Sequence, residues 1–179
     1  MNEYDVLSKV PRNCSEVEIA DFVSLVLAGG EVIPHGLEDR VRRAECISFL
    51  RYKSCFVGVA GLKRPSQNHR SEVSRWSGVT LPEESYPFEL GWVFILPSAR
   101  GKQLSLPLCT PLIETAGSHG TFATSKTDNR GMHITLQKLG FVSAGAPYKS
   151  PHGDHRLQLF VRSSVQQSVA ADRAKPCSG

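Results

Sequence analysis

The apolar run from Phe88 to Leu96 is the feature of this sequence that most limits the folds open to the chain. After Glu89 it contains almost no polar residue. Such a run is typical of a strand that is buried on both faces. A strand of this kind needs a covering layer on each side of its sheet. The sequence therefore predicts a central sheet with helices on both faces.

The remaining segments alternate between strand-like and helix-like patterns. Ser15 and Glu18 form a capping-box pattern that starts a helix, and Gly29-Gly30 stops it. Further helices are expected at 37–44, 104–116 and from Asp128 or Asn129 to Leu139. Strands are expected at 3–9, 47–52, 55–62, 88–96, 121–125, 141–144 and 156–162. The order β, α, α, β, β, β, α, β, α, β, β predicts a mixed α/β fold.

Two segments have an irregular composition. The stretch from Arg64 to Pro87 is rich in Ser, Pro, Arg and Glu, and it is longer than an ordinary connection between strands. The end of the chain, 163–179, is polar, and we expect it to be a mobile tail. The 179 residues correspond to roughly one domain at about 150 residues each. We therefore expect a single domain over 1–162.

Charge and cysteine content exclude several classes of protein. The net charge of +4 is too small to indicate a nucleic-acid partner without a basic stripe. No run of 18 apolar residues indicates a membrane span. The five cysteines are scattered and contain no Cys-x-x-Cys, which argues against a disulfide framework or a zinc site. We therefore expect no bound metal. The N-terminus does not resemble a secretory signal, and we expect a cytoplasmic protein.

The turn that follows the central strand has the features of an anion site. Arg100 and Gly101 lie between this strand and the helix that starts near Leu104. The start of a helix presents unpaired N–H groups and the positive end of the helix dipole. Arg100 and Lys102 add positive charge, and Gly101 permits close approach to the backbone. The pattern indicates a phosphate site; the alternative is an ordinary turn with two solvated cations.

These strings together resemble one known family. The segment 94–102, Phe-Ile-Leu-Pro-Ser-Ala-Arg-Gly-Lys, resembles the strand and pyrophosphate loop of the GNAT superfamily of acyl-CoA-dependent N-acyltransferases. The segment 121–124 resembles the next strand of that family, and 129–141 resembles its Asn-containing helix with a Leu-Gly-Phe exit. The motifs cover about 86–162, while 3–65 agrees only in the order of elements. The resemblance implies a mixed, mostly antiparallel sheet with helices on both faces.

The resemblance also implies an activity: transfer of an acetyl group from acetyl-CoA to an amine, by direct attack on the thioester. The acceptor would be a small molecule or a protein amine, and members of the family can form homodimers. The backbone of residues 94–96 would bind the pantetheine arm, residues 100–105 the pyrophosphate, and Asn129 would lie near the pantetheine or the thioester. The implied coenzyme-binding residues are Phe94, Ile95, Leu96, Arg100, Gly101, Lys102, Gln103, Leu104, Ser105 and Asn129.

Several residues depart from the family pattern. Gln103 and Ser105 stand where the family's phosphate loop has small residues, and their side chains narrow the space for a diphosphate. Pro111 lies inside the following helix, which we expect it to kink or delay. Leu136 occupies the position of the tyrosine that protonates the leaving thiolate in many members. These departures leave open a second hypothesis, a non-catalytic module that binds acyl-CoA or docks a partner.

Candidate catalytic residues follow from these departures. Tyr148, expected in a loop after a strand, is the preferred proton donor, with His133 and Ser125 as alternatives. Glu89 is the candidate base, because a carboxylate in an apolar strand should have a raised pKa. The alternative for Glu89 is a solvated strand end.

The residues expected to face the acceptor lie in the irregular stretch from 64 to 87. Trp76 beside Arg75 offers a stacking surface, and the alternative is a solvated loop. A third hypothesis, nucleic-acid binding through Arg64–Trp76, requires clustered basic surface. The segment 152–155, His-Gly-Asp-His, is interpreted as a turn, because it lacks the ligand geometry of a metal site. Other polar or aromatic residues of the stretch are His69, Arg70, Glu83, Glu84 and Tyr86.

Overall fold

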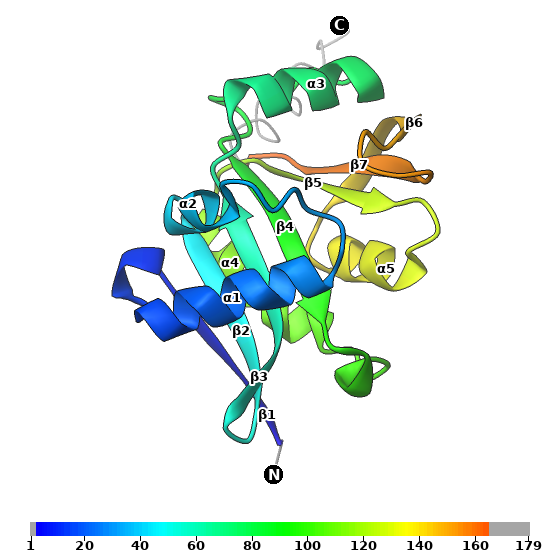
Figure 1. The fold of residues 1–179 in the computed structure, drawn as a ribbon. Coiled ribbons are helices and arrows are strands. Elements are labelled where there is room, and N and C mark those ends of the chain that lie inside the picture. Colours follow the sequence, from blue (N-terminus) through cyan, green and yellow to red (C-terminus); the bar gives the residue numbers. More distant parts are fainter. Residues whose placement is uncertain (1–2, 165–179) are drawn as a thin grey trace, which may run out of the picture.

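The computed structural model describes residues 3–164. Within this range, seven strands form one sheet in the order β1-β2-β3-β4-β5-β7-β6 (Figure 1). All neighbours in the sheet are antiparallel except β4 and β5, which are parallel. The strands are β1 Tyr4–Lys9, β2 Cys46–Tyr52, β3 Cys55–Lys63, β4 Phe88–Ile95, β5 Thr121–Lys126, β6 Val142–Lys149 and β7 Arg156–Arg162. The helices are α1 Glu16–Ala28, α2 Leu37–Arg42, α3 Gln67–Ser77, α4 Ser105–Ala116 and α5 Arg130–Lys138, with short 3-10 helices at Pro11–Asn13 and Pro97–Ala99.

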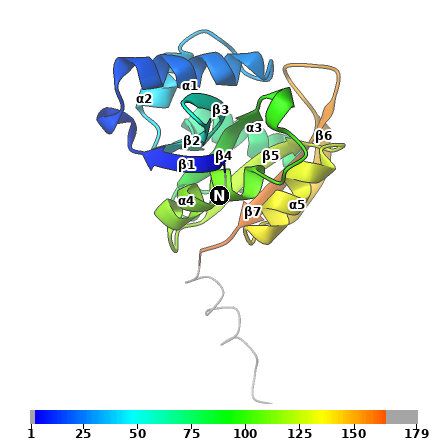
Figure 2. The same cartoon turned by 90° about the horizontal axis from the view of Figure 1, so that it is seen from below.

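Helices cover both faces of the sheet, as expected for a central strand that is apolar apart from Glu89. Figure 2 shows α1 and α2 above the strands, with α4 and α5 below them. On the first face, Phe22 and Val26 of α1 pack with Phe49 of β2. On the second face, Leu108 of α4 packs in one cluster with Leu90 of β4. The helix α3 packs against the part of the sheet formed by β6 and β7.

The sequence predictions hold for most elements, and local contacts explain why. The capping box is confirmed, because Ser15 Oγ accepts from Glu18 N at 3.2 Å and Glu18 Oε2 accepts from Ser15 N at 2.8 Å. The β2–β3 hairpin turns at Lys53, whose φ is 54°. Asn129 caps α5, since its Oδ1 accepts from Met132 N at 3.1 Å. The tail predicted at 163–179 lies outside the described residues from 165 onward.

Two expectations about irregular segments are wrong. The stretch 64–87 contains α3, which is capped by Ser66 and ends at Gly78, whose φ is 74°. The segment has few apolar residues, so its composition did not predict a helix. One buried face, formed by Arg70, Val73 and Ser77, packs the helix against the rest of the protein. Tyr148 lies in β6 and not in a loop, because the strand continues beyond a register shift between Ala144 and Tyr148.

The strands β4 and β5 separate after a very short ladder. They pair only at Phe88↔Thr121 and Glu89↔Phe122. On its other side β4 contains a bulge, since its register with β3 shifts between Val59 and Gly61 and Trp92 has a φ of 54°. A bulge bends a strand and increases its twist. The sheet is therefore open between β4 and β5 beyond Glu89.

Candidate active site

A large cavity occupies the opening between β4 and β5. Its volume is about 1830 Å³, and its walls come from β4, β5, β6, α3, the start of α4 and the loop after α1. Pockets for a single drug-sized ligand are typically about 300–1,000 Å³. The cavity therefore has room for two reactants. Its two ends have different chemistry, one formed by the start of α4 and the other by Glu89 and α3.

The turn before α4 forms the first end of the cavity. Gly101 and Gln103 both have positive φ, 77° and 57°. The N-cap residue Leu104 supplies no side-chain hydrogen bond to the helix. The N–H groups of the first turn of α4 are therefore open to a ligand, beside the positive end of the helix dipole. This arrangement can bind an anion.

The two cations predicted for this turn point in different directions. Arg100 lines the cavity, and its Nε donates to the carbonyl of Ile95 at 2.8 Å. Its guanidinium also lies 5.5 Å from the ring centre of Phe94. Lys102 does not line the cavity, because its Nζ donates to Tyr4 Oη at 2.7 Å on strand β1. Only Arg100 of this pair is placed to meet an anion in the cavity.

The remaining predicted coenzyme residues are brought together with one exception. Phe94, Ile95, Leu104 and Ser105 line the same cavity, as do Gly101, Gln103 and Asn129. Ser105 Oγ lies 2.8 Å from Thr135 Oγ1, which joins the start of α4 to α5. Leu96 is the exception: its N–H donates to Val57 O at 2.8 Å, and it is not part of the cavity wall.

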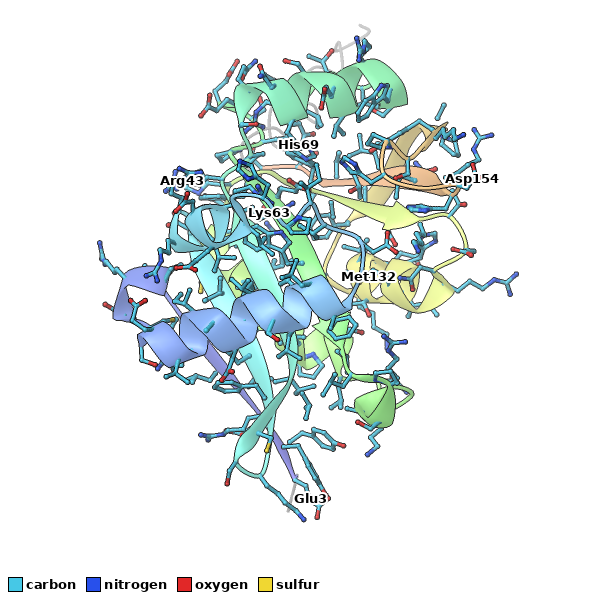
Figure 3. The ribbon with its side chains drawn as sticks, viewed as in Figure 1. Glu3, Arg43, Lys63, His69, Met132 and Asp154 are labelled. Carbon is cyan, nitrogen blue, oxygen red and sulfur yellow. The ribbon has the colours of Figure 1, made fainter. Side chains whose placement is uncertain are left out.

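Glu89 at the other end of the cavity is buried and paired with two side chains, Lys63 and His69. Glu89 is 3% exposed. Its Oε1 lies 2.7 Å from Lys63 Nζ, and its Oε2 lies 3.1 Å from His69 Nε2. Burial alone would raise its pKa, but the charges of Lys63 and His69 outweigh burial and lower the pKa to about 2. The expectation of a raised pKa is therefore wrong. These partners come from β3 and α3, and no local sequence pattern predicted that they would meet Glu89; Lys63 and His69 are labelled in Figure 3.

Tyr148 lies close to this carboxylate in the same cavity wall. It is 7% exposed, and its ring centre is 5.7 Å from that of Trp76 on α3. Burial and the negative charge of Glu89 both raise its pKa. The phenol therefore keeps its proton at neutral pH and can donate a hydrogen bond into the cavity.

The two alternative proton donors, His133 and Ser125, and the departure at Leu136 have the following surroundings. His133 Nε2 lies 2.9 Å from the carbonyl oxygen of Lys126, and its ring packs against Phe160 at 4.8 Å. Leu136 is fully buried in the core. Ser125 is buried and lines the cavity. The sequence analysis missed Lys63, which lies on β3 directly opposite Glu89 in the antiparallel pair β3–β4.

The segment 152–155 forms a turn between β6 and β7, as predicted. His155 Nε2 lies 3.5 Å from Glu31 Oε2, and Lys126 Nζ lies 2.5 Å from Glu31 Oε1. Among residues 3–164, no group of three or more His, Cys, Asp or Glu side chains is arranged to hold a metal ion. Within the same range, no helix is long and apolar enough to cross a bilayer.

Comparison with known proteins defines the class of fold. No family model and no curated protein matches the sequence. Among solved structures, ElaA from Escherichia coli is similar with 12% identity and a TM-score of 0.65, over 89% of this chain and 99% of that one. An acyl-CoA N-acyltransferase from Pseudomonas aeruginosa is similar with 13% identity and a TM-score of 0.65, over 89% and 99%. A structure of yncA from Salmonella typhimurium with its cofactor acetyl-CoA has 16% identity and a TM-score of 0.59, over 90% and 94%.

These similarities establish the class: the fold is that of the acyl-CoA N-acyltransferases. The chain has the GNAT fold, as its sequence motifs predicted.

Proposed function

We propose that the protein is an acyl-CoA-dependent N-acyltransferase, most simply one that transfers an acetyl group from acetyl-CoA to an amine. The observation that carries this proposal is the single cavity that joins the open start of α4 to the buried Glu89. One end offers backbone N–H groups for a diphosphate. The other end offers fixed charge and a phenol for proton transfer.

The residues of the cavity fit a coenzyme in an extended arrangement. The N–H groups of Gln103 to Leu106, with Arg100, would hold the diphosphate. The separated edge of β4 at Phe94 and Ile95 would bind the pantetheine arm, and Asn129 faces the same space. We leave Lys102 and Leu96 out of this set, because Tyr4 and Val57 already bind their polar groups.

The reaction needs two proton movements. The acceptor ammonium must lose a proton before its nitrogen attacks the thioester carbonyl carbon, and the sulfur gains a proton when the C–S bond breaks. We assign the first to the network around Glu89, whose carboxylate is ionised. We assign to Tyr148 a hydrogen bond to the departing sulfur, since its phenol stays protonated.

Isothermal titration with acetyl-CoA tests the coenzyme site. Wild-type protein is expected to bind, and R100E/G101E is expected to lose binding, because two carboxylates at the start of α4 repel a diphosphate. K102A is the matched control in the same turn: it removes a neighbouring cation that faces Tyr4, and it should bind as wild type does. Absence of wild-type binding at high micromolar acetyl-CoA would contradict the proposal.

A second candidate function is a non-catalytic acyl-CoA-binding module. The observation that favours it is Leu136, which is buried in the core at the position where many members of the family carry a proton donor. Thiol release distinguishes the two functions. Coenzyme binding without thiol release across a panel of tyramine, spermidine, L-lysine and glycine would favour the binding module.

A further inference from the structure

Both partners of Glu89 line the cavity, and His69 is the more exposed of the two. Its side chain is 41% exposed, while those of Lys63 and Glu89 are 20% and 5% exposed. Building on the proposed function, we propose that His69 is the catalytic base that takes the proton of the acceptor ammonium. Glu89 is then a positioning residue that acts through His69.

The burial of individual atoms defines which nitrogen of His69 can react. Nε2 is shielded from solvent and lies 3.1 Å from Oε2 of Glu89. Nδ1 is therefore the only ring nitrogen that can face the cavity. A neutral imidazole carries a proton on one nitrogen and a lone pair on the other. The ionised carboxylate favours the proton on Nε2, which leaves the lone pair of Nδ1 toward the acceptor.

Neither of the other two groups in the network is suited to this role. Lys63 carries an ammonium group that is held against Glu89, and an ammonium group has no lone pair. Glu89 has a pKa of about 2 and is a weak base at neutral pH. Its two oxygens are divided between two partners, Oε1 to Lys63 and Oε2 to His69. Lys63 thus fixes the orientation of the carboxylate, and the carboxylate fixes the imidazole.

The surrounding elements hold the imidazole in this orientation. The backbone N–H of His69 donates to Ser66 Oγ at 3.3 Å in the first turn of α3. The ring is stacked on Phe122 of β5, with centres 6.4 Å apart and an interplanar angle of 27°. Charged or titratable groups that line this part of the cavity with it are Glu89 on β4, Lys63 on β3, Tyr148 on β6, Glu72 on α3 and Arg64 in the connection before α3.

The proton balance of the step is complete without a further reactant. Nδ1 takes one proton from the ammonium, and the resulting imidazolium is paired with Glu89. The free amine attacks the carbonyl carbon, and the C–S bond breaks. The nitrogen loses one further proton as the amide forms, and the departing sulfur gains one, so the net proton count does not change. The imidazolium then returns its proton to solvent, which restores the base.

The test compares H69Q with N68A, its exposed neighbour on α3, in acetyl transfer to the fastest amine of the panel named above. H69Q is expected to lose about 10²-fold in kcat/KM at pH 7, a typical contribution of general base catalysis. Its rate should rise more steeply with pH than that of the wild type up to pH 9.5, because without the base only the unprotonated fraction of the amine reacts. N68A should follow the wild type, and both variants should bind acetyl-CoA normally, which controls for folding.

Three outcomes separate the two proposals. A wild-type pH profile in H69Q would overturn the role of His69 and leave the acyltransferase intact. Absence of thiol release by the wild type with every amine would overturn the proposed function and the base together. Nitrogen-15 NMR of wild-type His69 gives an independent readout: a proton on Nε2 supports the inference, and a neutral ring with its proton on Nδ1 contradicts it.

Discussion

At the scale of single residues, Gln103 shows how a departure from a family pattern is accommodated. The family pattern has a small residue here, and the backbone keeps the left-handed conformation that glycine adopts readily, with φ at 57°. The turn therefore has the backbone shape that suits a small residue, although its side chain is that of glutamine.

Replacing Gln103 by glycine is expected to stabilise the fold. The left-handed conformation costs a non-glycine residue about 1–2 kcal/mol. Glycine avoids this cost, but it loses about 0.5–1 kcal/mol more conformational entropy on folding, which offsets part of the gain. Q103G should therefore raise the free energy of unfolding by about 0.5–1 kcal/mol, measured by urea denaturation. A decrease would mean that the Gln103 side chain makes a stabilising contact in solution.

At the scale of elements, the sequence predicted those whose signals are local and missed those that depend on packing. The capping box of α1 and the hairpin at Lys53 need only neighbouring residues. The helix α3 packs against β6, so both elements rely on contacts between segments that are far apart in the sequence. The helix α4 begins at Ser105 and contains Pro111, so the proline does not delay the start of the helix. We find no structural reason for a proline there.

The contact between α3 and β6 can be tested at Gly145. A Cβ on this residue would lie 2.2 Å from the carbonyl oxygen of Ser77, and its φ is 65°. Gly30 is the matched control, with a φ of 71° and no atom within 4 Å of the Cβ position. Both alanine variants lose about 1–2 kcal/mol for the positive φ. G145A should be less stable than G30A by a further 1–3 kcal/mol, about the cost of overpacking, in the same denaturation assay.

Equal losses in the two variants would show that α3 shifts freely away from the sheet. That result would also weaken the placement of His69, which depends on the position of α3.

At the scale of the whole molecule, the fold was predictable from sequence to a greater extent than the site. The sequence predicted Arg100, Gly101 and Asn129 as members of one site through motifs of consecutive residues, and all three line the same cavity. The network of Lys63, Glu89 and His69 could not, because it joins two strands and a helix that only the tertiary fold brings together. The composition pointed to a single apolar core, and it gave no indication of a buried ionised carboxylate.

This buried carboxylate makes global stability depend on pH. Folding lowers the pKa of Glu89 from 4.5 to about 2, so its contribution is fully present above about pH 4.5 and is lost as the pH falls toward 2. E89Q should be less stable than the wild type at pH 7, because Lys63 and His69 lose their partner. The difference should shrink between pH 4.5 and 2 in urea denaturation. A difference that stays constant over this range would contradict the assignment.

The short ladder between β4 and β5 has a mechanical consequence. With only two residue pairs in common, these strands offer little backbone hydrogen bonding against separation along most of their length. Side chains connect the two parts of the sheet instead. On one face Ser105 meets Thr135 at 2.8 Å, and on the other Glu31 binds Lys126 at 2.5 Å. Side-chain contacts, and not a backbone ladder, therefore hold the two parts of the sheet together along the cleft: these bridges at its rim, and beneath it the core cluster that joins Leu108 of α4 to Leu136 of α5.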